Sequence, residues 1–179
     1  MAQARISVND TQDRIHRGHP WIFANQIVKE EGSYQPGDIV QVFDARNRPL
    51  GQGYINPVSL IRVRLLTPHV EERVNKEFIA GRIQRAWNYR QRMGYAGSCR
   101  VIFGEADMLP GLVVDKFNEI LSVQFLTLGM ERWKDVVLEA LTNTIKPQGI
   151  YIRNDVPIRE KEGLELSKGF HGKPFKTDL

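Results

Sequence analysis

The sequence predicts an α+β fold, in which a small, strongly curved β barrel precedes a second unit of strands and two packing helices. Three observations support this prediction. The first third has short apolar segments separated by Gly and Pro turns, a helical apolar pattern begins near residue 75, and strands then alternate with helices. At 179 residues the chain is long enough for two small cores. We expect the barrel over residues 1–70, the second unit over 71–163 and a linker over 164–179.

The barrel strands are predicted from turn signals and from alternation. Residues 38–43 (DIVQVF) follow a Pro-Gly turn and have the mixed apolar character of a half-buried strand. Residues 60–66 (LIRVRLL) alternate, so their aliphatic side chains share one face of a strand while Arg62 and Arg64 share the other. A short apolar piece, WIFANQIV, begins at Trp21 after a polar run.

The segment Gly51-Gln52-Gly53 lies on the return strand of the expected hairpin. A phosphate-binding glycine loop needs a helix opening directly after it and a third glycine at the right spacing, and neither is present. The two glycines therefore indicate a β-bulge or a close approach of two backbones.

The second unit is predicted to open with a helix. Asn75 can cap its start, an apolar stripe at helical spacing continues to about Met93, and Gly94 ends it. The later elements are predicted as strands over 99–104, 112–116, 120–126 and 149–153, with a second helix over 130–145.

Composition excludes several classes of protein. A single cysteine, Cys99, rules out an internal disulfide and a thiolate metal cage, and its apolar neighbours predict a packing role. No window approaches the ~20 apolar residues of a membrane span, and the first residues lack the apolar stretch of a secretory signal. A cytoplasmic location is expected. The net charge of +4 permits a polyanionic partner without requiring one.

Two groups of polar residues could carry chemistry. His16 and His19 have a spacing that could hold a metal on a helix, but a turn before Pro20 is favoured and no metal site is predicted. The acids Glu105, Asp107 and Asp115 flank a Leu-Pro-Gly turn. They could act as acid and base, or they could cap the turn by accepting backbone N–H groups; the second interpretation is favoured.

The cationic residues are more informative. Guanidinium groups pair with phosphate oxygens, and an aromatic ring can stack on an unpaired base. The alternative, a solvated face without a ligand, is equally compatible with the residues alone. The candidate RNA-binding residues are Arg14, Arg17, His19, Trp21, Arg46, Arg48, Arg62 and Arg64.

Several stretches resemble a known family. The segments DRIHRGHPWIFANQI and PGDIVQVFDARNRPLGQGYINPVSLIRVRLL resemble the N-terminal PUA domain of bacterial SAM-dependent ribosomal RNA methyltransferases. The arrangement is similar to that of the large-subunit cytosine-C5 enzymes, which have PUA, middle and Rossmann domains in that order. The segment RVIFGEADMLPGLVVDKFNEILSVQFLTLGMERW resembles their middle domain, and IRNDVPIREKEGLEL resembles their run into the catalytic domain.

The resemblance implies a PUA pseudo-barrel that docks ribosomal RNA and a middle domain that helps to form the substrate groove. It also implies that S-adenosylmethionine (SAM) is the cofactor of the parent enzyme, with no cofactor bound by this chain. Scaffold roles are implied for the residues around the Leu-Pro-Gly turn: Gly104, Glu105, Asp107, Pro110, Gly111 and Asp115.

The sequence departs from that family at Leu179, where a Rossmann domain with a glycine-rich SAM loop and a catalytic cysteine is expected to follow. Methylation at cytosine C5 needs a thiolate nucleophile, and Cys99 lies in the wrong segment for it. We expect an RNA-binding portion of a methyltransferase without catalytic residues, and whether the chain is itself an enzyme stays open. The alternatives are an enzyme that uses the turn acids, and a scaffold that dimerises or packs against the missing Rossmann domain.

Overall fold

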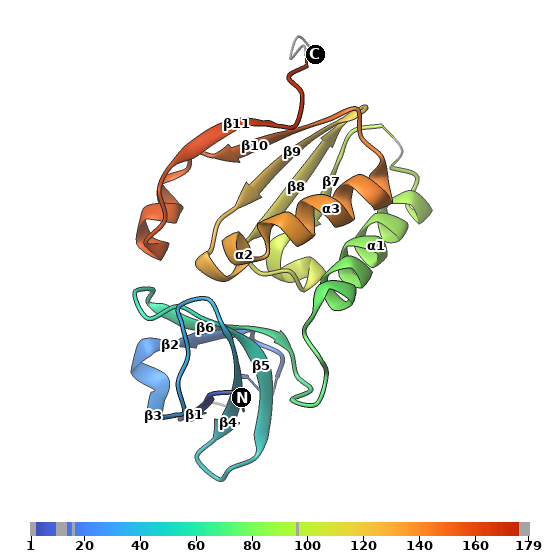
Figure 1. Ribbon diagram of the computed structural model, residues 1–179. Helices are drawn as coiled ribbons and strands as arrows, with labels where there is room; N and C mark the ends of the chain where they lie inside the picture. Colours follow the sequence, from blue (N-terminus) through green and yellow to red (C-terminus); the bar gives the residue numbers. More distant parts are fainter. Residues whose placement is uncertain (1–2, 10–13, 16, 96, 176–179) are drawn as a thin grey trace. The chain divides into compact units, whose positions relative to one another are not determined.

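The computed structural model describes residues 3–9, 14–15, 17–95 and 97–175. The chain divides into two compact units, Met1–Val74 and Asn75–Leu179, and each is described by itself (Figure 1). Over the described ranges, no helix combines the length and apolar character needed to cross a bilayer.

The N-terminal unit is a curled six-stranded half-barrel (Figure 1). Its strands follow the order β2-β6-β5-β4-β1-β3, and among them only β1 and β4 pair in parallel. Aliphatic side chains from most of its strands fill the inside of the curl, among them Ile6, Ile22, Val40 and Val63. The predicted curved barrel is therefore confirmed. The elements are β1 (Arg5–Val8), β2 (Trp21–Phe23), η1 (Ala24–Gln26), β3 (Ile27–Glu31), β4 (Ile39–Asp44), β5 (Pro49–Ile55) and β6 (Ile61–Thr67).

The glycines of β5 lie where two backbones meet. The register between β5 and β6 shifts between Gln52 and Gly53, as expected of a bulge. A Cβ atom at Gly53 would collide with the carbonyl oxygen of Arg64, and one at Gly51 would collide with that of Thr67. The prediction of a bulge or a close backbone approach is confirmed at both positions.

The second unit is a five-stranded sheet with the order β11-β10-β9-β8-β7. Strands β9 and β10 are parallel, and the helical segment between them makes the crossover that a parallel pair requires. Helices α1 and α3 lie across one face of the sheet (Figure 1) and bury the main core with it. The elements are α1 (Lys76–Arg92), β7 (Cys99–Phe103), η2 (Gly104–Asp107), β8 (Leu112–Phe117), β9 (Ile120–Phe125), α2 (Leu128–Arg132), α3 (Lys134–Ile145), β10 (Gly149–Asn154), η3 (Pro157–Glu162) and β11 (Ser167–His171).

The first predicted helix is confirmed, and the second is divided. The side chain of Asn75 accepts a hydrogen bond from the backbone N–H of Phe78 at 2.9 Å, which is the predicted cap of α1. The second helix begins two residues earlier than expected because Thr127 caps it. It is interrupted at Trp133, whose backbone leaves the helical region and whose N–H bonds back to the preceding turn.

The expected linker over 164–179 is wrong for residues 167–171, which form the edge strand β11. This strand is largely exposed and lacks apolar alternation, so its sequence gave no strand signal. Backbone pairing with β10 and one aromatic contact hold it instead. The rings of Tyr151 and Phe170 lie edge to face, with their centroids 5.0 Å apart.

Candidate nucleic-acid interface

A short loop that precedes Trp21 carries two arginines. Ile15 is buried in the half-barrel core and anchors the loop, while Arg14 and Arg17 on either side of it are exposed. The backbone N–H of His19 donates to the carbonyl of Arg14 at 3.0 Å and closes the loop. The chain therefore enters β2 with its arginines at the surface.

His19 connects this loop to the aromatic side chain. Its Nε2 lies 2.8 Å from a guanidinium nitrogen of Arg14, and its Nδ1 lies 3.2 Å from the backbone N of Trp21. A neutral imidazole has one acceptor nitrogen, so His19 can accept from only one of these donors at a time. The rings of His19 and Trp21 meet edge to face at 5.7 Å. Trp21 is thus oriented from its N-terminal side and stays partly exposed.

Arg64 supports Trp21 from the neighbouring strand. The two residues are directly paired between β2 and β6, and the guanidinium carbon of Arg64 lies 5.5 Å from the centroid of the indole ring. Arg64 is only 6% exposed, so its guanidinium is largely covered, and its role in RNA binding stays a prediction. Its paired neighbours are Trp21 on β2 and Tyr54 on β5. Arg62 is partly buried and donates to the carbonyl of Pro57.

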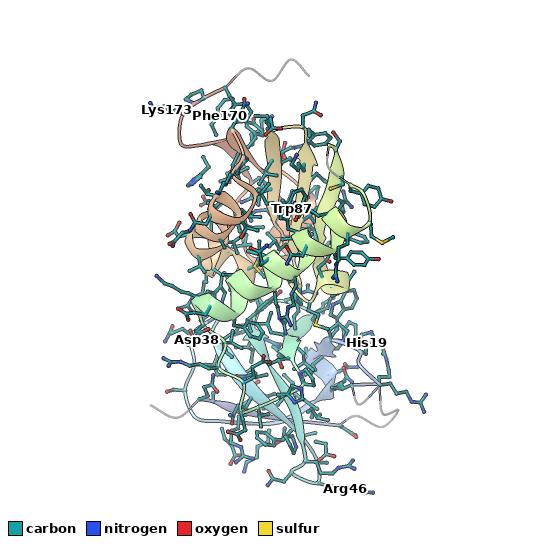
Figure 2. The ribbon with its side chains drawn as sticks, turned by 90° about the vertical axis from the view of Figure 1, so that its right-hand side faces the viewer. His19, Asp38, Arg46, Trp87, Phe170 and Lys173 are labelled. Atoms are coloured by element: carbon teal, nitrogen blue, oxygen red, sulfur yellow. The ribbon has the colours of Figure 1, made fainter. Side chains whose placement is uncertain are left out.

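Arg46 and Arg48 lie apart from this group. They occupy the turn between β4 and β5, at the opposite end of the unit from His19 (Figure 2). Asp44 accepts hydrogen bonds from the backbone N–H groups of both arginines and from Nε of Arg48 at 2.6 Å. Burial tends to raise the pKa of Asp44, but these hydrogen bonds outweigh it and hold the pKa below its usual range.

Three partly or largely exposed apolar residues of the N-terminal unit were missed by sequence reasoning. The ring of Phe23 meets that of Trp21 edge to face at 6.4 Å. The loop between β5 and β6 exposes Val58 and Leu60, the latter 81% exposed, and the carbonyl of Leu60 accepts from the N–H of Ala24 directly after β2. Alternation along β2 would have placed Phe23 beside Trp21. The loop residues carried no signal, because apolar residues in a turn are expected to be buried.

The acids around the Leu-Pro-Gly turn are engaged by arginines. Asp107 forms a two-pronged ion pair with Arg90 at 2.6 and 2.7 Å and accepts the backbone N–H of Phe103. Asp115 pairs with Arg100 at 2.8 and 3.0 Å, and the hydrogen bonds that Arg100 donates to this carboxylate raise the pKa of the arginine. This geometry favours structural roles for both carboxylates, since an acid–base catalyst needs access to a substrate proton.

The remaining residues of the turn are two glycines, a proline and a glutamate. Gly104 and Gly111 have φ values of +51° and +78°, and a Cβ at Gly111 would collide with the side chain of Thr127. Pro110 is buried and Glu105 is partly exposed in η2.

The residues suggested for metal, thiol or cofactor chemistry do not form such a site. His16 lies outside the described residues, and no group of three potential metal ligands occurs within them. Cys99 packs against the core of the second unit, and burial raises the pKa of its thiol. The loop from β9 to α2, residues 126–127, has no glycine, and Gly129 is buried in the first turn of the helix. This loop therefore lacks the glycine-rich turn at a helix N-terminus that would bind SAM.

Comparison with known proteins identifies the class of the N-terminal unit. Residues 9–68 match the family described as PUA-like domain, and this unit is a PUA-like domain. Over most of its length the chain is homologous to ribosomal RNA large subunit methyltransferase I from several bacteria. It is 37% identical over 157 residues to the protein from Serratia proteamaculans, covering 86% of this chain and 39% of that protein. With the Shewanella denitrificans protein it shares 39% identity over 175 residues, covering 94% and 44%.

A solved structure shares the same fold. A candidate SAM-dependent methyltransferase from Streptococcus mutans superposes with a TM-score of 0.76 at 13% identity, covering 96% of this chain and 44% of that one. The chain thus spans about two fifths of the length of the relatives it matches.

Proposed function

We propose that this chain is the RNA-docking portion of a SAM-dependent, large-subunit rRNA methyltransferase of the cytosine-C5 type. The observation that carries the proposal is the assembly of Trp21, His19 and the flanking arginines on one edge of a PUA-like domain. An aromatic ring beside cations is the combination that binds unpaired nucleotides. The homologous relatives are named as rRNA methyltransferases, which makes ribosomal RNA the proposed partner.

Each residue of the cluster has a proposed task. Trp21 offers its exposed ring surface to an unpaired base, with Arg64 behind it and His19 at its edge. Arg14 and Arg17 bind backbone phosphates, because both are exposed and guanidinium groups match phosphate oxygens. Arg62, Arg46 and Arg48 add secondary phosphate contacts, weaker at Arg48 because Asp44 already holds its guanidinium.

In this proposal the methyl donor and the nucleophile belong to other parts of the enzyme. The relatives are more than twice as long as the region they share with this chain. SAM supplies the methyl group when bound to that enzyme. The residues described here bind and orient the RNA, and a SAM-binding catalytic domain is their proposed partner in the cytoplasm.

Filter binding to a structured rRNA fragment, with salt titrated from 50 to 300 mM, tests the proposal. We expect Arg17→Ala to weaken binding and to reduce the slope of log K against log salt by about one, since one phosphate contact is lost. Arg73→Ala is the matched control, because it removes an exposed arginine of the same unit to which no phosphate contact is assigned, and we expect it to have little effect. Equal binding by wild type and Arg17→Ala would exclude the proposed surface.

A further inference from the structure

One face of the second sheet is not covered by α1 and α3. Side chains alternate across a strand, so neighbouring positions of β8 and β9 point to opposite faces. Leu112, Val114, Leu121 and Val123 point to the helices and belong to the core. The intervening positions point away from it, and no helix of the described residues lies over them in Figure 1. We call this surface the open face.

One row of side chains crosses the open face on all five strands. The register pairs Arg100 with Asp115, Asp115 with Ser122, Ser122 with Tyr151, and Tyr151 with Phe170. The row therefore has an ion pair at one end, a small hydroxyl in the middle and two aromatic rings at the other end. Figure 2 shows Phe170 at the end of this unit, near Lys173.

A second row adds another ring and an amide. Phe103 pairs with Val113, and Val113 pairs with Gln124. Phe103 is 56% exposed at the end of β7, and Asp107 accepts a hydrogen bond from its backbone N–H. Gln124 and Ser122 are partly exposed between the aromatic ends. The open face thus offers flat apolar rings separated by hydrogen-bonding groups.

The charges of the open face are mixed, with basic groups in excess. Arg100 pairs with Asp115, while Arg153 and Lys168 share one acid, Asp155, at 3.3 and 3.9 Å. Three cations against two carboxylates leave a positive balance, and both basic residues of the shared group are exposed. Such a balance suits a polyanion.

We propose that the open face is a second RNA-binding surface, which takes a short unpaired strand. Phe103 at one edge and Tyr151 with Phe170 at the other stack on bases, Ser122 and Gln124 bond base edges, and Arg153 and Lys168, which share one carboxylate, bind phosphates. The inference rests on the proposed RNA-binding function but concerns the other unit of the chain. A protein partner fits less well, because polar and ion-paired residues interrupt the apolar surface.

The first test adds one negative charge to the open face with almost no change in shape. Gln124→Glu should weaken binding of a twelve-residue oligouridylate at low salt by about fivefold or more, through repulsion of its phosphates. Gln91→Glu makes the same change on an exposed position of α1 and should stay within about twofold of wild type. Both are measured by fluorescence anisotropy with the full chain.

The second test removes a ring. Phe103→Ala should weaken oligouridylate binding by about fivefold or more, because stacking on one aromatic is commonly of that size. Tyr89→Ala, which removes a ring 51% exposed on α1, should leave it within about twofold. Irradiation at 254 nm should cross-link oligouridylate to peptides containing Phe103, Tyr151 or Phe170.

The outcomes separate this inference from the proposed function. If wild type binds RNA but Gln124→Glu and Phe103→Ala bind oligouridylate as tightly as their controls, the open face is not an RNA site and the Trp21 surface stands. If these variants change only self-association in sedimentation, the open face is a protein contact and the inference is wrong. If wild type binds no RNA and Arg17→Ala has no effect, the proposed function fails as well.

Discussion

Trp21 is held in place by its neighbours on two sides. The ring of His19 meets its edge and the guanidinium of Arg64 lies over it, so the indole loses little freedom when a base stacks on it. The addition of a single atom can prevent such an arrangement from forming. The same strand that carries Arg64 passes so close to β5 that only glycine fits at position 53. The carboxylates of Asp107 and Asp44 are likewise held by arginine side chains, those of Arg90 and Arg48.

Gly53→Ala tests the close approach beneath the Trp21 cluster. The added Cβ meets the Arg64 carbonyl, so β5 and β6 must separate, and we expect a loss of about 2 kcal/mol or more in the free energy of unfolding. Gly169→Ala is the control, because a Cβ there meets no atom within 4 Å, and it should change stability by less than about 0.5 kcal/mol. Urea denaturation measures both. Equal effects would contradict the close approach.

Asp107→Asn tests whether the turn acids are structural. The change breaks a well-buried ion pair with Arg90 and should cost about 2–3 kcal/mol in unfolding free energy. Asp115→Asn breaks a more exposed pair with Arg100, so we expect it to cost less than about 1 kcal/mol. Thermal and urea melts give both values. A fully stable Asp107→Asn protein would return the acids to consideration as catalysts.

Asp44 should make stability depend on pH in the acid range. Its pKa is lower in the folded chain than in the unfolded chain, so its contribution is complete above the unfolded value of about 3.9. The contribution disappears as the pH falls through the lower folded value. Melts between pH 6 and pH 2.5 should therefore show a smaller loss of Tm for Asp44→Asn than for wild type. An identical loss of Tm at low pH in the two proteins would show that Asp44 does not contribute to this pH dependence.

At the scale of elements, the sequence predicted most of the fold and placed the ends of α1 closely. Turn glycines, caps and apolar spacing are local signals, and they located β2, β4, β5, β6, α1 and β7 to β10, whereas β1 was not predicted. The features that the sequence did not predict depend on contacts between distant parts of the chain. The alternation of β6 placed Arg62 and Arg64 on one strand face, but it could not show that Arg64 is buried beside Trp21. Strand β11 is held by pairing with β10 instead of by burial, so its composition could not reveal it.

Asn75→Ala tests the cap that begins the second unit. Removing the side-chain acceptor leaves the N–H of Phe78 without its partner in the first turn of α1, and we expect a loss of about 1 kcal/mol. Asn88→Ala, at an exposed position of the same helix, should be neutral or slightly stabilising because alanine favours helix interiors. Chemical denaturation followed by far-ultraviolet circular dichroism compares them. A neutral Asn75→Ala would contradict the assigned cap.

At the scale of the whole molecule, two units with separate cores present two different surfaces to solvent. The candidate site was predicted in part: the entry loop and Trp21 were chosen from cation and aromatic content, and the structure brings Arg14, His19, Trp21 and Arg64 together. The separation of Arg46 and Arg48 from this group of residues could not be predicted, because it depends on where the β4–β5 turn lies in the folded sheet. The open face was not foreseen, since it requires the register of five strands.

The chain contains three tryptophans, which give the central claim an internal control. Trp21 is partly exposed in the candidate site, Trp87 is buried in the core of the second unit, and Trp133 packs against that core. Titration of a structured rRNA fragment into the ¹⁵N-labelled chain should move or broaden the indole N–H resonance of Trp21 while that of Trp87 stays in place, and added salt should reverse the change. A Trp21 resonance that is unaffected at low salt, while the RNA is bound, would contradict the account.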